Sequence, residues 1–250
     1  MKLTNYKVLT FDCYGTLIDW ETGIIAALQP LLAKAATRPS LAKAATPLAT
    51  DLVLETFARH ESAQEAETPQ MIYSDLLAAV HRRLADEWGV TASDAEHRRF
   101  GESVPDWPAF ADSATALAYL KQHYKLVILS NVDRNSFAGS NAKLGVRFDA
   151  IYTAQDIGSY KPDLANFRYM LDHLAELGVA KSDILHTAQS LFHDHAPARA
   201  LGLASAWIDR RHASGGFGAT MAPPEQANYD IRFTSLADLA AAHRAELAMS

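Results

Sequence analysis

The stretch FDCYGTL, Phe11–Leu17, begins at the end of the first apolar run of the chain, Lys7–Asp12 (KVLTFD). Continuous apolar runs of this kind are typical of strands that are buried on both faces of a parallel sheet. A turn after the strand explains the glycine of this stretch, but no turn requires the carboxylate of Asp12. An acid that emerges from a buried strand therefore marks a candidate functional site.

The rest of the chain alternates between short apolar runs and longer helical patterns, such as Ser113–His123 and Ala165–Leu177. This alternation predicts an α/β fold with a doubly wound parallel sheet. The other predicted strands are Leu126–Asn131, Ala150–Ala154, Asp183–Thr187, Ser205–Asp209 and Asp230–Phe233.

One long interval, between the first strand and Leu126, departs from this alternation. It reads mostly as helix, with spaced apolar positions in Glu21–Ala36, Pro47–Arg59 and Gln70–Trp88. A structureless loop of that length is improbable in a compact domain. We therefore expect a helical cap domain at residues 19–105, inserted into a core domain formed by residues 1–18 and 106–250.

Two segments are interpreted as local features of this organisation. Leu32–Thr37 and Leu41–Thr46 both read LAKAAT, which indicates a short duplication that lengthens the cap. His212–Pro224, rich in glycine and proline, is predicted to be a surface loop, with a position over the active site as the alternative.

The composition limits the classes of partner. The chain has 29 acidic and 23 basic residues, a formal charge of -6, which is a poor match for nucleic acid or anionic lipid. The single cysteine, Cys13, excludes an internal disulfide and is typical of a reducing compartment. The N-terminus lacks a signal-peptide pattern, and no apolar run approaches the roughly 18 residues that cross a bilayer. We expect a cytoplasmic protein with no nucleic-acid or membrane partner.

Polar residues follow several of the predicted strands. Ser130 and Asn131 end the second run, Lys161 lies in the SYKPD segment after the third, and Asp194 lies in AQSLFHD after the fourth. Ligands of doubly wound sheets bind at the carboxyl ends of the strands. The sequence therefore predicts that an acid, a hydroxyl with an amide, a lysine and a second acid meet there.

These motifs, FDCYGTL, LSN, YKPD and AQSLFHD, resemble in their order the motifs of the haloacid dehalogenase superfamily. The resemblance implies a Rossmann-like core with an inserted cap. It also implies that Asp12 attacks the substrate and forms an ester intermediate. Lys161 would keep Asp12 ionised, and Asp194 would hold Lys161 or orient the hydrolytic water.

The same resemblance implies where the substrate binds. Ser130 and Asn131 would hold its anionic group. Trp20 would line the pocket or pack at the hinge of the cap. Tyr14 and Ser190 complete the expected substrate-binding set.

Two positions differ from the magnesium-dependent phosphatases of the superfamily. Tyr14 stands where they carry a second aspartate, and a phenol, whose ordinary pKa is about 10, is a poor general acid. Gln189 stands where they carry a magnesium-binding aspartate. We therefore expect no metal ligand and no cofactor, and a leaving group that needs no proton. Tyr14 matches the 2-haloacid dehalogenases, so the first expectation is displacement of halide at C2 of a small carboxylate.

Other residues depart from that subfamily. Phe167 replaces a usual tyrosine, Ser190 or Leu191 replaces an asparagine, and Arg59 is the nearest candidate for the halide-binding arginine. The run FDCYGTLIDWETGI is also similar to the azetidine-2-carboxylate hydrolases, which open a four-membered ring. The alternatives are therefore that ring opening, a phosphatase with a degraded magnesium site, or a binding module without activity. A homodimer is possible.

Several residues near these motifs are interpreted as structural. Cys13 should point away from Asp12, because side chains alternate along a strand. His193 and His195, which flank Asp194, are expected to diverge rather than bind a metal. Tyr73 and Phe57 on the cap are assigned to its core.

Overall fold

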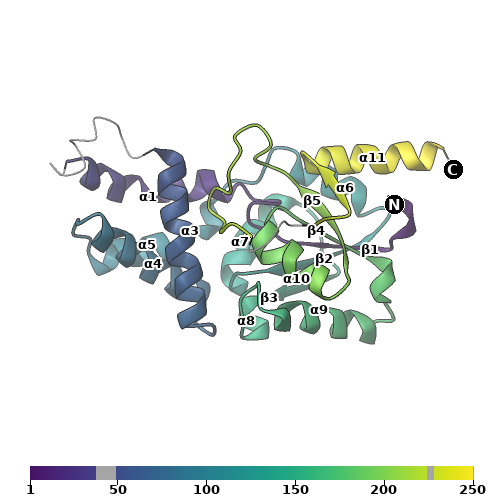
Figure 1. The fold of residues 1–250 in the computed structure, drawn as a ribbon, viewed down its shortest axis with the longest axis horizontal. Coiled ribbons are helices and arrows are strands. Elements are labelled where there is room, and N and C mark those ends of the chain that lie inside the picture. The colour runs from purple at the N-terminus through teal and green to yellow at the C-terminus, as the bar shows by residue number, and fades with distance from the viewer. Residues whose placement is uncertain (38–48, 224–227, 250) are drawn as a thin grey trace.

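The protein is described by a computed structural model that covers residues 1–37, 49–223 and 228–249. Its centre is a six-stranded, fully parallel sheet in the order β3-β2-β1-β4-β5-β6 (Figure 1). The predicted doubly wound α/β fold is therefore confirmed, and each predicted strand lies within about one residue of an observed one. The strands are β1 (Val8–Phe11), β2 (Lys125–Ser130), β3 (Ala150–Thr153), β4 (Ile184–Ala188), β5 (Ala204–Ile208) and β6 (Ile231–Phe233).

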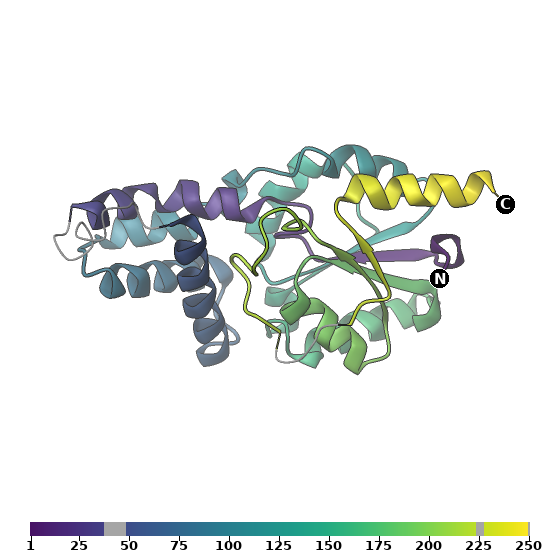
Figure 2. The ribbon, with the colours of Figure 1, turned by 45° about the horizontal axis from the view of Figure 1, so that its top comes forward.

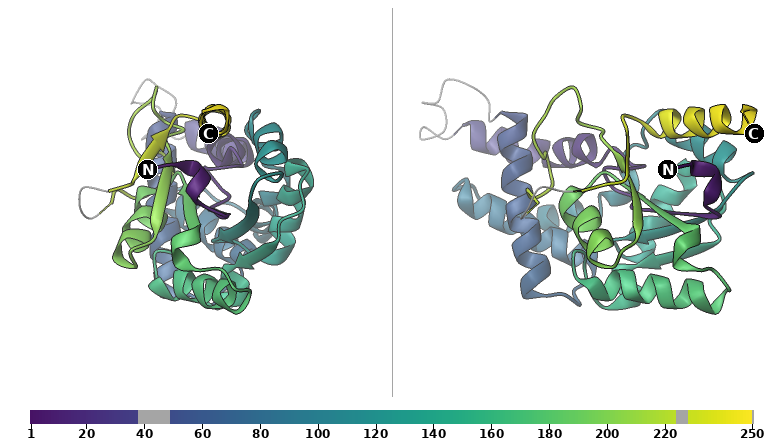
Figure 3. Two further views of the ribbon diagram at one scale, coloured as in Figure 1. Left: turned by 90° about the vertical axis from the view of Figure 1, so that its right-hand side faces the viewer. Right: turned by 45° about the vertical axis from the view of Figure 1, so that its right-hand side comes forward.

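Helices cover both faces of the sheet, as the left view of Figure 3 shows, which looks along the longest axis of the molecule. The alternation of side chains divides the apolar core between these faces. Leu126 and Ile128 belong to the same cluster as residues of α6 (Ser113–Leu120) and α11 (Leu236–Ala248), whereas Val127 and Leu129 belong to that of α9 (Leu164–Glu176). The core helices are α6 (Ser113–Leu120), α7 (Arg134–Leu144), α8 (Ala154–Ile157), α9 (Leu164–Glu176), α10 (Ala196–Ala200) and α11 (Leu236–Ala248).

A helical insertion follows β1, in agreement with the predicted cap. Helix α3 packs on α1 and α4, and α4 packs on α5. In Figure 2 these helices lie at one end of the molecule, and both termini lie at the other. Their bounds are α1 (Trp20–Ala36), α3 (Thr50–Glu67), α4 (Tyr73–Glu87) and α5 (Asp94–Gly101).

The two chain segments that join insertion and core run side by side. The Asp19 backbone N–H donates to the carbonyl of Pro108 at 2.8 Å, and Ile18 forms a β-bridge with Ala109. This places the start of the cap beside its end. The proposed limits of the cap domain, residues 19–105, stay a prediction.

Helix α3 is longer than the sequence indicated. The apolar pattern ended at Arg59, but the helix continues to Glu67. The added turns read HESAQEAE and lack apolar periodicity, because Glu61, Gln64 and Glu65 are the buried residues on their inner face. Pro47, Leu48 and the second LAKAAT copy, Leu41–Thr46, lie outside the described residues.

None of the helices in the described ranges is long and apolar enough to cross a membrane.

Candidate active site

The candidate site lies at the carboxyl edge of the sheet, where β1 and β4 end on either side of the point at which the strand order reverses. A small cavity of about 30 Å³ lies there between the core and helices α3 and α4. We call it the inner cavity. Of the predicted site residues, all except Ser130 line it: Asp12, Tyr14, Trp20, Asn131, Lys161, Ser190 and Asp194.

Lys161 joins the two predicted catalytic acids. Its Nζ lies 3.0 Å from Oδ1 of Asp12 and 2.7 Å from Oδ1 of Asp194, and it also donates to the carbonyl of Leu129 at 3.1 Å. All three charged side chains are almost completely buried. Three residues from distant parts of the chain thus form one ionic cluster.

The electrostatics of this cluster differ between the two acids. Burial raises the pKa of Asp12, while the charge of Lys161 and a hydrogen bond from Thr16 oppose that rise. Burial also acts on Asp194, but Lys161 and His186 outweigh it and hold the pKa of Asp194 well below its usual range. Burial lowers the pKa of Lys161, and the two carboxylates raise it by more. Asp194 is therefore the permanently ionised partner of Lys161.

Thr16 fixes the second oxygen of Asp12, a role that the sequence analysis missed. Its hydroxyl donates to Oδ2 of Asp12 at 2.8 Å and accepts from the backbone N–H of Gln189 at 2.9 Å. The preceding Gly15 has φ +87°, and a Cβ there would lie 2.9 Å from Nε1 of Trp20. Both the positive φ and the close approach require glycine. The signal for Thr16 was its place in the Gly-Thr turn.

His186 on β4 is a second residue that the sequence analysis missed. Its Nε2 lies 3.0 Å from Oδ1 of Asp194, and its Nδ1 lies 2.8 Å from the hydroxyl of Thr10 on the adjacent strand. Both contacts are satisfied when Nε2 carries the proton, because a carboxylate only accepts. Oδ2 of Asp194 has no hydrogen-bond partner, although Asp194 lines the inner cavity. That oxygen is available to accept a hydrogen bond from a water or a substrate.

The predicted substrate-binding residues differ in how far they are already engaged. Asn131 donates to Glu65 at 3.0 Å and accepts from the Lys161 N–H at 2.7 Å, so it fixes the lysine loop. The hydroxyl of Ser190 accepts from the backbone N–H of His193 at 2.9 Å. Ser130 is buried, and its hydroxyl has no partner. Of these three, Ser130 alone keeps an unused side-chain hydrogen-bonding group.

Tyr14 is buried and shares a hydrogen bond of 2.9 Å with the hydroxyl of Ser140. Burial raises its pKa well above the usual value, so the phenol stays neutral. The neighbouring Cys13 is also fully buried, and burial raises the pKa of its thiol. A thiolate nucleophile is therefore disfavoured at this position.

Two glutamates of helix α3, Glu61 and Glu65, form the cap side of the inner cavity. The Tyr73 hydroxyl donates to Oε1 of Glu61 at 2.5 Å, and Tyr73 lines the cavity as well, so its assignment to the cap core was incomplete. Burial raises the pKa of Glu61 to about 8. Burial, followed by the charge of Glu61, raises the pKa of Glu65 well above its usual value. The only sequence signal was the spacing of two acids four residues apart, which places them on one helix face.

Arg59 does not reach the inner cavity. It is 54% exposed and pairs with Glu87 on α4 at 2.7 Å. Phe167 is fully buried behind β4, with its ring centroid 5.0 Å from that of His186. The expectation that Arg59 is the nearest halide ligand is therefore wrong for this structure, because it faces the opposite side of α3 from Glu61.

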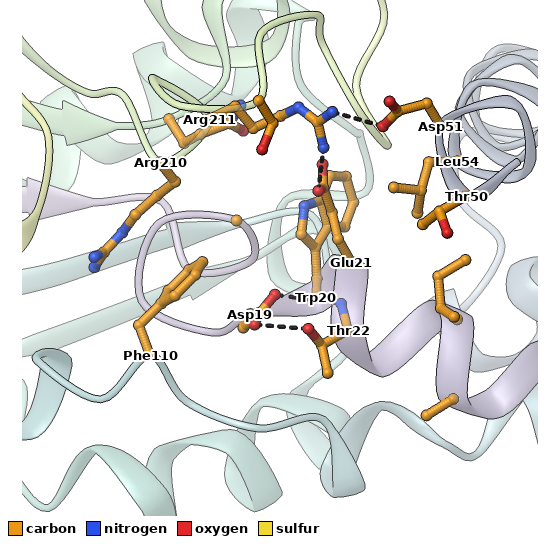
Figure 4. A pocket seen from close by; sticks show the side chains of 15 residues that line it. Asp19, Trp20, Glu21, Thr22, Thr50, Asp51, Leu54, Phe110, Arg210 and Arg211 are labelled. Atoms are coloured by element: carbon orange, nitrogen blue, oxygen red, sulfur yellow. Dashed lines mark hydrogen bonds and ion pairs between the residues drawn. The ribbon is translucent and has the colours of Figure 1, made fainter.

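A second, larger cleft of about 650 Å³ lies beside the inner cavity, with Trp20 lining both. We call it the outer cleft. Figure 4 shows Arg211 above Trp20, where it pairs with Glu21 of α1 and, at 2.7 Å, with Asp51 of α3. The 212–224 segment, predicted as a surface loop, is mostly exposed in its described part, but it also carries Thr220 into the inner cavity.

Within the described ranges, no group of three or more His, Cys, Asp and Glu side chains is arranged to hold a metal ion. His195 contacts the carbonyl of Ala188 and the hydroxyl of Ser205, each at 3.0 Å, whereas His193 lines the inner cavity. The two histidines diverge, as expected. The absence of a cofactor stays a prediction.

A family model of haloacid dehalogenase-like hydrolases matches residues 6–187. The chain belongs to this family. The match confirms the superfamily and the hydrolase class expected from the four motifs. No curated protein matches this hydrolase.

Solved structures with the same fold include the L-2-haloacid dehalogenase PA0810, which is 24% identical with a TM-score of 0.70 over 94% of this chain and 98% of that one. The defluorinating L-2-haloacid dehalogenase Rha0230 is 21% identical, with a TM-score of 0.74 over 97% and 98% of the two chains. The L-2-haloacid dehalogenase of Xanthobacter autotrophicus with chloropropionic acid covalently bound is 18% identical, with a TM-score of 0.72 over 96% and 98%. At these identities the likeness concerns the fold of the hydrolase.

Proposed function

We propose that this hydrolase displaces a leaving group from C2 of a small carboxylate through an ester on Asp12. The observation that carries the proposal is the position of Lys161, whose Nζ contacts both Asp12 and Asp194 at the base of the inner cavity. An oxygen of Asp12 would attack C2, and the electron pair of the broken bond would depart with the leaving group. Water, oriented by a hydrogen bond to the free oxygen of Asp194, would then add to the ester carbonyl. One proton of that water goes to the departing alkoxide oxygen of the product, and the other goes to solvent. The products are a 2-hydroxy acid and the regenerated Asp12.

Several features of the cavity support this reaction over phosphate ester hydrolysis. The neutral, hydrogen-bonded Tyr14 occupies the place of a proton-donating acid, and Gln189 the place of a metal-binding one. A phosphate ester needs charge neutralisation and a protonated leaving group, and neither residue supplies them.

Halide is the first candidate for the leaving group. The structurally similar Xanthobacter autotrophicus dehalogenase carries chloropropionic acid as a covalent adduct. An equivalent adduct here would place the propionate carbon on Asp12.

A protonated ring nitrogen is the second candidate, and the contents of the inner cavity favour it. Lys161 is the single lysine or arginine among the described residues that line this cavity, and two carboxylates already engage it. Arg59 is paired elsewhere, and Phe167 supplies no hydroxyl. A halide that leaves as an anion would therefore find few hydrogen-bond donors or positive charges to stabilise it. A strained cyclic amine leaves as a neutral nitrogen and does not need them.

The test is a single turnover in H₂¹⁸O with excess enzyme, using (S)-2-chloropropionate and L-azetidine-2-carboxylate in parallel, with and without chelator. We expect unlabelled product from the first turnover and one ¹⁸O in the peptide that contains Asp12. Asp12→Asn should abolish turnover, while Asp172→Asn, an exposed matched change on α9, should not. Label in the product of the first turnover, with none in the peptide, would exclude the ester. The compound that reacts identifies the leaving group.

A cytoplasmic location and a homodimer remain predictions from the sequence.

A further inference from the structure

We propose that Glu61 and Glu65 form a recognition site for a protonated amine, so that the preferred substrate carries an ammonium group beside its carboxylate. The proposal rests on the proposed function, because it names the substrate class of the same cavity. It assigns two specificity-determining residues to the cap.

The two side chains are placed for such a role. They lie four residues apart on α3, are 3% and 6% exposed, and line the same cavity as the nucleophile Asp12. Glu65 accepts from Asn131 at 3.0 Å, and Glu61 accepts from Tyr73 at 2.5 Å, so both carboxyl groups are held in fixed orientations. Neither forms an ion pair with a lysine or arginine of the described chain.

Two acids buried without an ion-pairing lysine or arginine among the described residues are energetically costly. Removing a carboxylate from water costs several kcal/mol unless a positive charge compensates it. Protonation of the acids lowers this cost, since burial raises the pKa of both. A ligand cation would supply the missing charge and ionise one of them.

The inner cavity also holds buried polar atoms that lack any partner. These are Nε2 of His193, Oδ2 of Asp194 and the hydroxyl of Thr220. Nε2 of His193 lies 3.9 Å from Oε2 of Glu65, too far for a hydrogen bond, and burial lowers the pKa of this imidazole to about 4. Buried polar atoms are normally satisfied, so these atoms offer hydrogen-bonding positions to water or to a polar ligand.

The charge balance of the surroundings agrees with a cationic rather than an anionic group on the cap side. With the acids ionised, the lining contains four carboxylates and one lysine, which disfavours an anion beside α3. The titratable groups that face Glu61 and Glu65 from other elements are Tyr14, Tyr73, Tyr160, Lys161, His193 and Asp12.

Opening of a protonated four-membered ring fits this arrangement. Asp12 forms the bond to C2, the C2–N bond breaks, and its electron pair stays on the nitrogen, which already carries two protons. The nitrogen becomes a primary amine on the same product and takes a further proton from water. The cap carboxylates would bind the charged nitrogen before this step, so they act mainly on affinity.

The test is calorimetric binding to the unreactive Asp12→Asn protein of two ligands with the same ring size: L-azetidine-2-carboxylate, and cyclobutanecarboxylate, which lacks the nitrogen. We expect the amine to bind at least ~10-fold more tightly, since a charge-assisted hydrogen bond to a carboxylate is stronger than any contact that the cyclobutane ring can make. Glu65→Gln or Glu61→Gln should reduce that ratio toward one. Glu55→Gln, on the exposed face of the same helix, should keep it.

A second readout excludes a purely structural role. Binding of the amine should release protons, because a neutral carboxyl ionises, and the heat should therefore vary with the ionisation enthalpy of the buffer. Cyclobutanecarboxylate should show no such dependence. A ratio near one in the parent protein, no measurable binding of the amine, or an unchanged ratio in both glutamine variants overturns the proposal. If the ¹⁸O experiment fails while the ratio holds, the ester mechanism is wrong and the amine site stands.

Discussion

Nζ of Lys161 lies 3.0 Å from Oδ1 of Asp12, and both side chains are withdrawn from solvent beneath the cap. The same nitrogen contacts Asp194, so one positive charge stabilises two negative ones. An ion cluster of this kind contributes little net stability, but its loss leaves uncompensated charges in a buried place. The lysine therefore links the integrity of the fold to the readiness of the nucleophile.

Replacing Lys161 with methionine tests that link. We expect Lys161→Met to lower the free energy of unfolding by about 3–5 kcal/mol, because Asp12 and Asp194 lose their shared partner. Turnover should fall by at least ~100-fold, because the pKa of Asp12 rises further without Lys161 and less of the nucleophile is then ionised. A ~100-fold loss corresponds to a change of two pKa units, at about 1.4 kcal/mol each. Urea unfolding and steady-state kinetics measure both. Lys125→Met, at an exposed strand start, is the control, and comparable loss there would argue against a specific role.

Thr16→Val tests the orientation of the nucleophile without a change in charge. The hydroxyl holds Oδ2 of Asp12 and accepts from the N–H of Gln189, so its removal frees the carboxylate to rotate. A hydrogen bond to a charged group contributes about 1.5–3 kcal/mol, which predicts a roughly 10- to 100-fold lower kcat. Thr115→Val, exposed on α6, should leave kcat unchanged. An unaltered kcat in the Thr16 variant would show that other contacts suffice to orient Asp12.

The sequence predicted the core of this site because the strands and their ends are encoded locally. Apolar runs located all six strands, and the parallel arrangement required their polar ends to meet at one edge. Asp12, Lys161 and Asp194 were found in this way. Their mutual distances follow from the fold rather than from any one motif.

The cap side of the site was not predictable by the same rule. Glu61 and Glu65 lie in a polar stretch of α3 that resembles a solvated helix end, and only tertiary packing shows that this face is buried. His186 was hidden for a related reason: it lies within a buried strand, and its partners, Thr10 and Asp194, come from other elements. Apolar periodicity detects core faces but not polar ones that face a cavity.

The buried Glu61 makes stability depend on pH in a defined direction. Its pKa is about 8 in the folded protein and near 4.5 when unfolded, so between these values the native state holds more protons. Stability should therefore fall as pH rises from about 4.5 to 8. Glu61→Gln should reduce this slope, as seen by urea unfolding at pH 5, 6.5 and 8, whereas Glu55→Gln should retain it. Equal slopes in the parent and Glu61→Gln proteins would contradict the buried, protonated state.

The Arg211 ion pairs couple the core loop to the cap. Arg211 is largely buried between Glu21 on α1 and the exposed Asp51 on α3, so a single core residue contacts two cap helices beside Trp20. Because at least one partner is solvent-exposed, Arg211→Met should cost only about 1 kcal/mol or less of global stability.

Loss of these ion pairs should affect local opening between cap and core more than it affects global unfolding. We therefore expect faster amide hydrogen exchange at residues 20–24 and 50–54 in the variant, together with a KM that depends less on salt than the KM of the parent. Arg82→Met removes an exposed pair with Asp94 within the cap and should change neither. Exchange that stays unchanged at both segments in Arg211→Met would show that apolar packing around Trp20, rather than these charges, holds the cap against the core.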